Sequence, residues 1–558
     1  MNKIKYLLTA FVIILVSLSC NEDEWLKEEA LDFYAPENSF VTTEQFNSAV
    51  ARLYEGTDNC VMWSAHTGNY VYQYTSDIAY YAIDPTHDLN SYADKITPET
   101  SQIRQFWERY YRVIFDANVI LGRIENEGVE VPDAQKSIFK SEASFFRAYM
   151  YRNLAHQFGG VPIILEEFTE PKRDFQRSSR EAVYQQCITD LEYATANLPG
   201  VTDLKEEGRL TKAAANHLLA EIYIAVGEYD KAIAAASSVI NDPNYALMTT
   251  RFGNRKDVPG DPYYDLFVRG NQNRNGNINT ESIWVAQYEY LADGGGRGSN
   301  LCRFLVPLYW QLTGDSDGKS LFFGHSNQHG GRGIGWMAAS DYLLNQVWED
   351  DPNDMRNSEY NIIRDLVADN PESAYFGQKI VESGAIDNYP DPYNRRWSAL
   401  FAKSAPINHF PEEVIADPET GATLNGANMT FRDHYYMRLA ETYLLRAEAY
   451  LAKGDQAKAA EDINTVRARA NALPVAAGDV DIDYILDERA RELNFEELRI
   501  VTLMRLGKLV ERVKKYDPMH NGDIVANGIS DFHNLWPIPN SEIERNTEAV
   551  LEQNPGYN

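Results

Sequence analysis

The chain has 558 residues, more than the roughly 250–300 that one hydrophobic core usually serves, so we expect two or more lobes. It carries 82 acidic and 52 basic residues, a formal net charge of −30, which disfavours a nucleic-acid partner because the phosphate backbone needs a basic surface. Aromatic residues make up 12% of the chain, and 35 of them are tyrosines, whose large ring and polar tip suit recognition surfaces.

The first 42 residues are predicted to direct the chain to a membrane surface. Residues 1–19 are predicted to be a signal peptide, in which two lysines precede an apolar run at 6–16 that is too short to span a bilayer. Small residues then precede Cys20, which resembles the cleavage box of bacterial lipoproteins, so Cys20 is predicted to carry the lipid. Residues 20–42 are predicted to be the lipidated tether, and the acidic run at 21–24 resembles a surface-export signal. The alternative is an ordinary signal peptide with an incidental cysteine.

Residues 43–243 form the predicted N-terminal helical and repeat region. Apolar residues recur three and four positions apart, which is one face of a helix. Gly159 and Gly160, followed by a proline, end one of these helices. The stretch 60–81 is instead aromatic and irregular. The predicted helices cover 43–56, 101–125, 135–158, 179–198 and the two arms of a hairpin at 212–241.

A second αα-hairpin is predicted over residues 432–470. Apolar residues from Tyr436 onward recur on one helical face, and Gly454 ends this helix because glycine readily takes the left-handed conformation. Residues 220–239 align with residues 447–466 without a gap, and they share an aromatic, the turn glycine and small residues. The pattern resembles the tetratricopeptide repeat, whose units bury their apolar faces by stacking on further hairpins. The alternative is two unrelated amphipathic helix pairs.

The region between the two hairpins has a different composition. Helical periodicity is sparse from 244 to 430, where Gly, Asn, Asp, Pro and aromatic residues dominate, and short apolar pieces such as 282–291 fit strands. Because a long loop-rich excursion in a helical protein is usually functional, we predict a ligand-binding insertion at 244–430. The C-terminal repeat hairpin and further helices are predicted at 431–515, and prolines predict an extended segment at 516–558.

Eight sequence motifs carry a family resemblance. In chain order they are FWERYYRVIFDANVIL, EASFFRAYMYRNLAHQFGGVPII, RSSREAVYQQCITDLEYATANLP, GRLTKAAANHLLAEIYI, MRLAETYLLRAEAYL, DERARELNFEELRIVTLMRLGKL, LWPIPNSEI and NPGY. Together they resemble the SusD/RagB family of nutrient-binding lipoproteins of Bacteroidota. The resemblance runs from Cys20 to the C-terminus and is weakest between about 244 and 430.

The resemblance implies both a fold and a role. The implied fold is mainly α-helical, a tetratricopeptide-repeat-like scaffold with a loop-rich, partly irregular insertion that forms the binding face. The implied role is capture of a nutrient, often a glycan, at the cell surface for import through a partner TonB-dependent outer-membrane transporter. The protein would then be an outer-membrane lipoprotein anchored at Cys20.

Charged residues in the C-terminal motifs are interpreted as structural. Glu488, Glu492 and Glu496 stand four residues apart with arginines nearby, which is the spacing of ion pairs that tie helices together. The same interpretation covers Arg438, Glu441, Arg446, Glu448, Arg489 and Arg499.

No motif predicts catalysis, a cofactor or a metal site. His325 and His329 are four apart but lie in a glycine-rich loop without the glutamate of an HExxH motif. Asp315 and Asp317 resemble only a fragment of a calcium-binding loop. Paired carboxylates of a glycan hydrolase stay open as an alternative, because 82 acidic residues produce many accidental pairs.

Aromatic residues in the irregular stretches are the sharper binding candidates. A flat ring can stack on the apolar face of a sugar while nearby polar groups bind its hydroxyls. Any single ring is more simply read as core, but at least two of the set are predicted to face the ligand. Trp336 is the first choice, because neighbouring glycines would leave its loop free to present it, and Trp63 is the second. The full set is Trp63, Tyr70, Tyr72, Tyr309, Trp310 and Trp336.

Three interpretations of function follow. The leading one is a non-catalytic glycan-binding lipoprotein that serves uptake. The second is a peptide-binding protein of the same architecture, as the RagB branch implies, and the third is a surface glycan hydrolase. For one ligand to meet both aromatic stretches, residues 60–81 and 293–336 must lie side by side.

Overall fold

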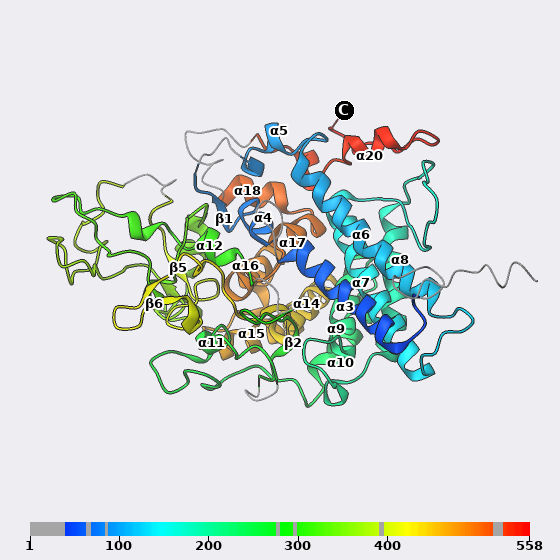
Figure 1. Cartoon of the computed structure of the whole chain (residues 1–558), viewed down its shortest axis with the longest axis horizontal. Coiled ribbons are helices and arrows are strands. Elements are labelled where there is room, and N and C mark those ends of the chain that lie inside the picture. Colours follow the sequence, from blue (N-terminus) through cyan, green and yellow to red (C-terminus); the bar gives the residue numbers. More distant parts are fainter. Residues whose placement is uncertain are drawn as a thin grey trace, which may run out of the picture.

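The computed structural model describes residues 39–62, 69–83, 88–274, 279–293, 298–389, 395–516 and 528–557. The predicted signal peptide, Cys20 and Trp63 lie outside these residues. Figure 1 shows long helices packed together at the right and short strands joined by long loops at the left. We call residues 39–243 and 431–557 the helical half, and residues 244–430 the loop-rich half.

The N-terminal helices form where the apolar periodicity predicts them. The Thr42 side chain accepts a hydrogen bond from the Gln45 backbone amide, and the Gln45 side chain accepts one from the Thr42 backbone amide. This capping box starts the first long helix. Gly159, with φ of +77°, ends another. From α6 to α10, each helix packs against the next in the chain (Figure 1). The long helices here are α3 (Thr43–Val61), α6 (Ser101–Arg123), α7 (Asp133–Phe158), α8 (Arg180–Asn197), α9 (Lys212–Ala225) and α10 (Tyr229–Ile240).

The two predicted repeat hairpins are confirmed and lie against each other. Helices α9 and α10 form the first, while α14 (Leu439–Ala452) and α15 (Gln456–Arg469) form the second. Gly227 and Gly454 close the first helix of each pair, both with φ of +81°, and a Cβ atom at either position would meet nothing within 4 Å. Glycine is therefore required for its conformation and not for space. Helix α10 packs on α14, where Arg446 donates to the Ser237 hydroxyl at 2.9 Å, so stacking joins repeats about 200 residues apart.

The structure corrects the predicted start of the second hairpin. Tyr436 was expected on the helical face, but it lies in strand β8 (His434–Arg438), and α14 begins only at Leu439. Strand β8 pairs antiparallel with β2 (Ser282–Ala286), and the Tyr436 ring stacks on Trp284 with ring centroids 4.0 Å apart. The cross-strand partner, which is distant in sequence, outweighs the local helical pattern.

The loop-rich half has a hydrophobic core of its own. Buried side chains that include Cys302, Tyr309 and Phe322 form this second cluster, separate from the core beneath the long helices. The loops are therefore packed. Two-stranded antiparallel pairs support them: β1 (Ala79–Tyr81) with β3 (Met337–Ala339), β4 (Ile362–Ile363) with β5 (Leu400–Phe401), and β6 (Ile415–Asp417) with β7 (Ala422–Thr423).

Shorter helices complete the chain. Trp107 and Trp536 are both buried. None of the helices in the described ranges combines the length and the apolar character that crossing a bilayer requires. The shorter helices are α4 (Asn69–Tyr74), α5 (Tyr92–Lys95), α11 (Pro262–Asp265), α12 (Leu301–Leu305), α13 (Asp341–Leu344), α16 (Ile482–Leu493), α17 (Arg499–Arg505), α18 (Leu509–Tyr516) and α20 (Asn540–Arg545).

A buried ion-pair network lies where the two halves meet. Arg356 contacts Glu488 at 2.7 Å and Glu492 at 3.0 Å, and Arg438 contacts Glu492 at 2.9 Å. The network balances six cations against six carboxylates: Arg356, Lys403, Arg438, Arg467, Arg469 and Arg491 against Glu281, Asp351, Asp354, Glu488, Glu492 and Glu496.

This network confirms the structural interpretation of the charged motifs. Arg356 and Lys403 come from the loop-rich half, whereas Glu488 and Glu492 come from α16 in the helical half. Burial alone would raise the pKa of the Glu488 carboxyl, but the surrounding guanidinium groups, first that of Arg356, lower it to about 2. The Glu488 carboxylate is thus ionised at neutral pH and helps to hold the two halves together.

We expect Glu492→Gln to destabilise the protein strongly. The substitution keeps the side-chain volume but leaves Arg438, Arg469 and Arg356 without one of their buried counter-charges. Removing one partner of a buried pair typically lowers the free energy of unfolding by about 3–5 kcal/mol. Urea-induced unfolding measures this loss. Glu511→Gln, which breaks an exposed pair with Lys508, is the control and should cost less than about 1 kcal/mol. Equal effects of the two substitutions would contradict the structural role of the network.

Candidate functional site

The two aromatic stretches meet through a strand pair. In the antiparallel pair of β1 and β3, Ala79 lies opposite Ala339 and Tyr81 lies opposite Met337. The ladder continues beyond the strands, because the Ala82 amide donates to the Trp336 carbonyl at 2.8 Å. The structure therefore brings the end of the first stretch beside the end of the second, as a shared ligand surface requires.

Trp336 is half-buried at this meeting point. Its ring stacks on Phe304 of α12, with centroids 5.2 Å apart and planes 27° apart. Phe304 in turn stacks on Tyr70 of α4 at 4.4 Å. This column of three rings joins both stretches and fixes the orientation of the indole of Trp336, which is partly buried.

The loop before Trp336 is locked, which corrects the expectation of a free glycine-rich loop. A Cβ atom on Gly333 would collide with the Val306 carbonyl, and one on Gly335 would collide with the Arg395 carbonyl. These glycines permit close backbone packing. We call residues 331–336 with Trp310 the Trp336 surface. Trp310 is half-buried and donates from its indole nitrogen to the Gly333 carbonyl at 2.9 Å.

Three of the predicted site residues are core residues. Tyr70 is 2% exposed, and Tyr72 and Tyr309 are fully buried. The Tyr72 hydroxyl shares a hydrogen bond of 2.6 Å with Tyr110, and the Tyr309 hydroxyl donates to the Gly331 carbonyl at 3.0 Å. A stacked sugar needs an open ring face, and these three rings have none, so their assignment to ligand contact is corrected. Trp310 and Trp336 stay candidates, and Trp63 lies outside the described residues.

Arginines around the loop were missed by the sequence analysis. Arg395 donates from Nε to the Ile334 carbonyl at 3.0 Å, and the Ile334 amide donates to the Arg303 carbonyl at 2.8 Å. Arg332 lies within the loop and Arg396 follows Arg395, with its guanidinium 5.4 Å from the centre of the Tyr389 ring. The sequence signal was present in the runs GRGIGW and RRW, where arginine adjoins tryptophan.

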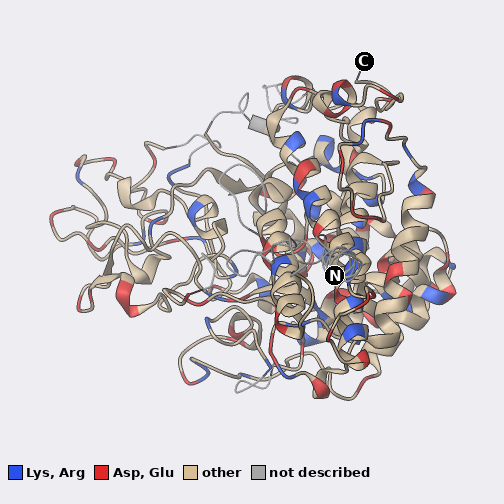
Figure 2. Cartoon of the chain, turned by 45° about the vertical axis from the view of Figure 1, so that its right-hand side comes forward, with Lys and Arg blue, Asp and Glu red and all other residues tan. Residues whose placement is uncertain are grey.

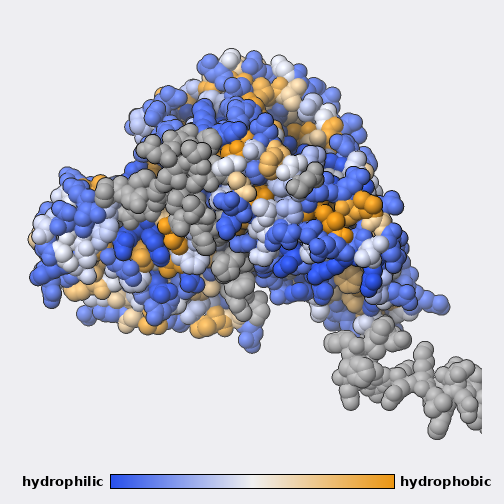
Figure 3. All heavy atoms as spheres, turned by 90° about the horizontal axis from the view of Figure 1, so that it is seen from above, coloured by the Kyte–Doolittle hydropathy of each residue, from blue (hydrophilic) through white to orange (hydrophobic). Residues whose placement is uncertain are grey.

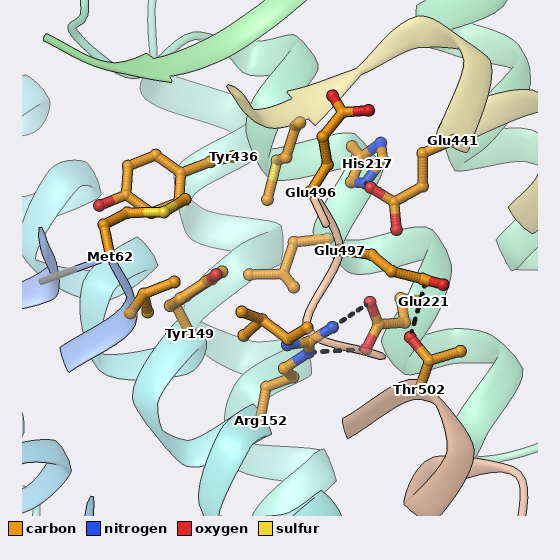
Figure 4. A pocket seen from close by; sticks show the side chains of 14 residues that line it. Met62, Tyr149, Arg152, His217, Glu221, Tyr436, Glu441, Glu496, Glu497 and Thr502 are labelled. Atoms are coloured by element: carbon orange, nitrogen blue, oxygen red, sulfur yellow. Dashed lines mark hydrogen bonds and ion pairs between the residues drawn. The ribbon is translucent and has the colours of Figure 1, made fainter. Parts of the chain in front are cut away.

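A small polar pocket lies between helices of the scaffold. Figure 4 shows Arg152, His217, Glu221 and Glu497 converging there, with Arg152 bonded to both carboxylate oxygens of Glu221. Its volume of about 30 Å³ admits no more than one or two water molecules. We therefore assign it to the scaffold. A wider polar cleft of about 570 Å³, lined in part by Asn273, Tyr288 and Asp433, lies at the end of the β2–β8 pair.

The candidate metal and catalytic residues have ordinary partners. The Nδ1 atom of His325 shares a hydrogen bond of 2.7 Å with the Thr423 hydroxyl, and that of His329 shares one of 3.0 Å with Ser326. Within the described ranges, no group of three or more His, Cys, Asp or Glu side chains is placed to hold a metal ion. Figure 3 shows a largely hydrophilic surface with small apolar patches.

Sequence comparison identifies related proteins along most of the chain. Residues 338–557 match the sequence model of the SusD family, and residues 24–224 match one described as starch-binding associating with outer membrane. SusD-like protein P25 of Formosa agariphila is 24% identical, and the alignment covers 100% of both chains. The starch-binding protein SusD of Bacteroides thetaiotaomicron is 29% identical over 32% of this chain and 29% of its own.

Solved structures share the fold. A laminarin-binding SusD-like protein superposes with a TM-score of 0.68 at 23% identity, covering 93% of this chain and 100% of the other. Surface glycan-binding protein A from Bacteroides thetaiotaomicron, in complex with laminarihexaose, gives a TM-score of 0.66 at 20% identity, covering 92% and 100%.

Proposed function

This chain belongs to the SusD/RagB family, and from that premise we propose that it captures an oligo- or polysaccharide at the cell surface for import. The partner would be a TonB-dependent outer-membrane transporter. Related proteins support this proposal, since they are known as starch-binding, as laminarin-binding, as bound to laminarihexaose, or as associating with the outer membrane.

The Trp336 surface is the proposed binding site. The observation that carries this assignment is the β1–β3 pair, which joins the two aromatic stretches, together with the incomplete burial of Trp310 and Trp336. Because the loop is locked by close backbone packing, little conformational entropy is lost when a ligand binds. Two stacked rings with hydrogen bonds correspond to a Kd between about 1 μM and 1 mM. Such weak binding suits a protein that hands its ligand to a transporter.

The proposed mechanism is binding without catalysis. A glycan hydrolase needs two carboxyl groups about 5–10 Å apart on either side of the scissile bond, one of them with a raised pKa. In this chain the carboxylates of the C-terminal motifs are held in buried ion pairs, and their guanidinium partners lower the pKa of Glu488 and Glu492. We therefore assign these carboxylates to the stability of the scaffold and not to catalysis.

We expect Trp336→Leu to weaken glycan binding at least tenfold, about 1.4 kcal/mol. Leucine keeps apolar contact with Phe304 but removes the flat ring that would stack on a sugar. Isothermal titration against an oligosaccharide that the wild type binds gives the Kd, and thermal unfolding checks the fold. Phe376→Ala, an exposed ring elsewhere in the loop-rich half, is the control and should leave the Kd unchanged. Unchanged binding by Trp336→Leu would remove Trp336 from the site.

The lipid anchor makes a separate prediction. One acyl chain holds a protein only marginally at a bilayer, whereas a lipidated bacterial cysteine carries more than one. We expect Cys20→Ala to give a folded protein that is released from the outer membrane. Membrane fractionation in a strain that lacks the transporter measures this. A variant that still sediments wholly with membranes would contradict lipidation at Cys20.

A ligand captured for import must survive capture. We therefore expect no turnover of any glycan or peptide that the purified protein binds. Reducing-end and free-amine assays over many hours at high protein concentration test this expectation. A sustained release of either product, which a second purification step does not remove, would favour the hydrolase interpretation.

A further inference from the structure

The Trp336 surface carries a local excess of positive charge on an acidic protein. The chain has a net charge of −30, yet Arg332 lies in the loop at 331–336, and Arg303 and Arg395 are hydrogen-bonded to this loop at Ile334. Arg396 follows Arg395 in the chain. Figure 2 shows basic residues among the loops as well as on the helices. The question is what the guanidinium groups of Arg303, Arg332 and Arg395 bind.

Three of these arginines have no carboxylate partner in the ranges that the structure describes. Arg303, Arg332 and Arg395 form no ion pair with any described residue, and the Nε atom of Arg303 is buried without a hydrogen-bond acceptor in the part of the chain that the structure describes. The buried arginines at the junction of the halves differ sharply, because Arg356 and Arg438 each contact more than one carboxylate. Among the described residues, the charges of Arg303, Arg332 and Arg395 are thus not balanced by ion pairs.

The local electrostatics show that these cations repel one another. Burial and then the neighbouring Arg332 lower the pKa of Arg303, and burial and then Arg396 lower the pKa of Arg395. The same positive field extends to His325, whose pKa is lowered by burial and by Arg332. Packing holds the arginines in place, because the Arg303 and Arg395 carbonyls accept hydrogen bonds from Ile334 and Leu308.

We propose, building on the proposed function, that the glycan bound at the Trp336 surface is anionic. Its sulfate esters or carboxylates would pair with the guanidinium groups of Arg303, Arg332 and Arg395, while Trp336 and Trp310 stack on its sugar rings. The planar fork of arginine matches the oxygens of both anions in two parallel hydrogen bonds. A neutral glycan would leave these charges uncompensated.

The overall negative charge does not prevent such binding. Exposed charges more than about 10 Å apart are largely screened at 0.1 M ionic strength, so the nearby arginines dominate over the distant carboxylates. The proposal consequently predicts that affinity falls as salt is added, since screening also weakens the exposed part of each arginine contact.

Matched pairs of polysaccharides test the proposal. Titrations of the mature protein would compare dextran with dextran sulfate, and polygalacturonate with its methyl ester, with laminarin as a further neutral ligand. Each pair shares a backbone and differs in charge, so the two pairs separate sulfate from carboxylate. We expect the charged member of at least one pair to bind about tenfold more tightly, with an affinity that decreases with salt.

Substitutions at two arginines distinguish the effect of local charge at the site from the effect of the protein's net charge. The side chain of Arg332 forms no hydrogen bond or ion pair among the described residues, so Arg332→Gln should fold normally and weaken binding of the charged glycan about tenfold. Arg332→Lys keeps the positive charge but not the planar fork of the guanidinium group. Its affinity for the charged glycan should lie between those of the wild type and Arg332→Gln. Arg104→Gln changes the net charge equally on an exposed face of α6 and should leave binding unchanged.

The outcomes distinguish the two proposals. Equal binding of the neutral and charged members, unaffected by Arg332→Gln, would overturn the anionic ligand and leave glycan capture standing. Binding of polyglutamate but of no glycan would overturn both in favour of a peptide ligand. Binding of neither class would overturn both as well.

Discussion

Twelve charged side chains paired in the interior set the geometry of this protein. Moving a charged group from water into a protein interior costs several kcal/mol, and only well-placed opposite charges offset that cost. Here Arg356 and Lys403 of the loop-rich half form ion pairs with carboxylates of α16 and of the segment after it. Displacement of one half would separate these buried ions, which is energetically costly. The pairing therefore defines how the loops sit on the helices.

A chain of constraints leads from this network to the ligand surface. The network fixes the loop-rich half, and the core around Tyr309 and Phe322 fixes its loops. Close packing at Gly333 and Gly335 then fixes the loop that carries Trp336. A site held in this way loses little entropy on binding, so a few rings and charges suffice for recognition of a flexible glycan. The scaffold can be shared among relatives while the loops differ.

Local signals in the sequence predicted the helical half well. Gly454 takes the left-handed conformation that ends one helix before the next begins. The position of this turn can be predicted from the single glycine. Long-range contacts could not be read in this way. Tyr436 fits a helical pattern but pairs with Trp284, and Tyr72 sits in an irregular aromatic stretch but bonds to Tyr110. The arginines were not singled out because their significance lies in Arg332 forming no ion pair with a described residue, which only the folded chain reveals.

The most direct test is a crystal structure of the mature protein with an oligosaccharide long enough to cross the Trp336 surface. Our account predicts an intact ligand with a sugar ring stacked on Trp336, an anionic substituent beside Arg332 or Arg395, and the loop at 331–336 unmoved. A ligand bound in the cleft lined by Asn273, Tyr288 and Asp433, or a cleaved ligand, would contradict it.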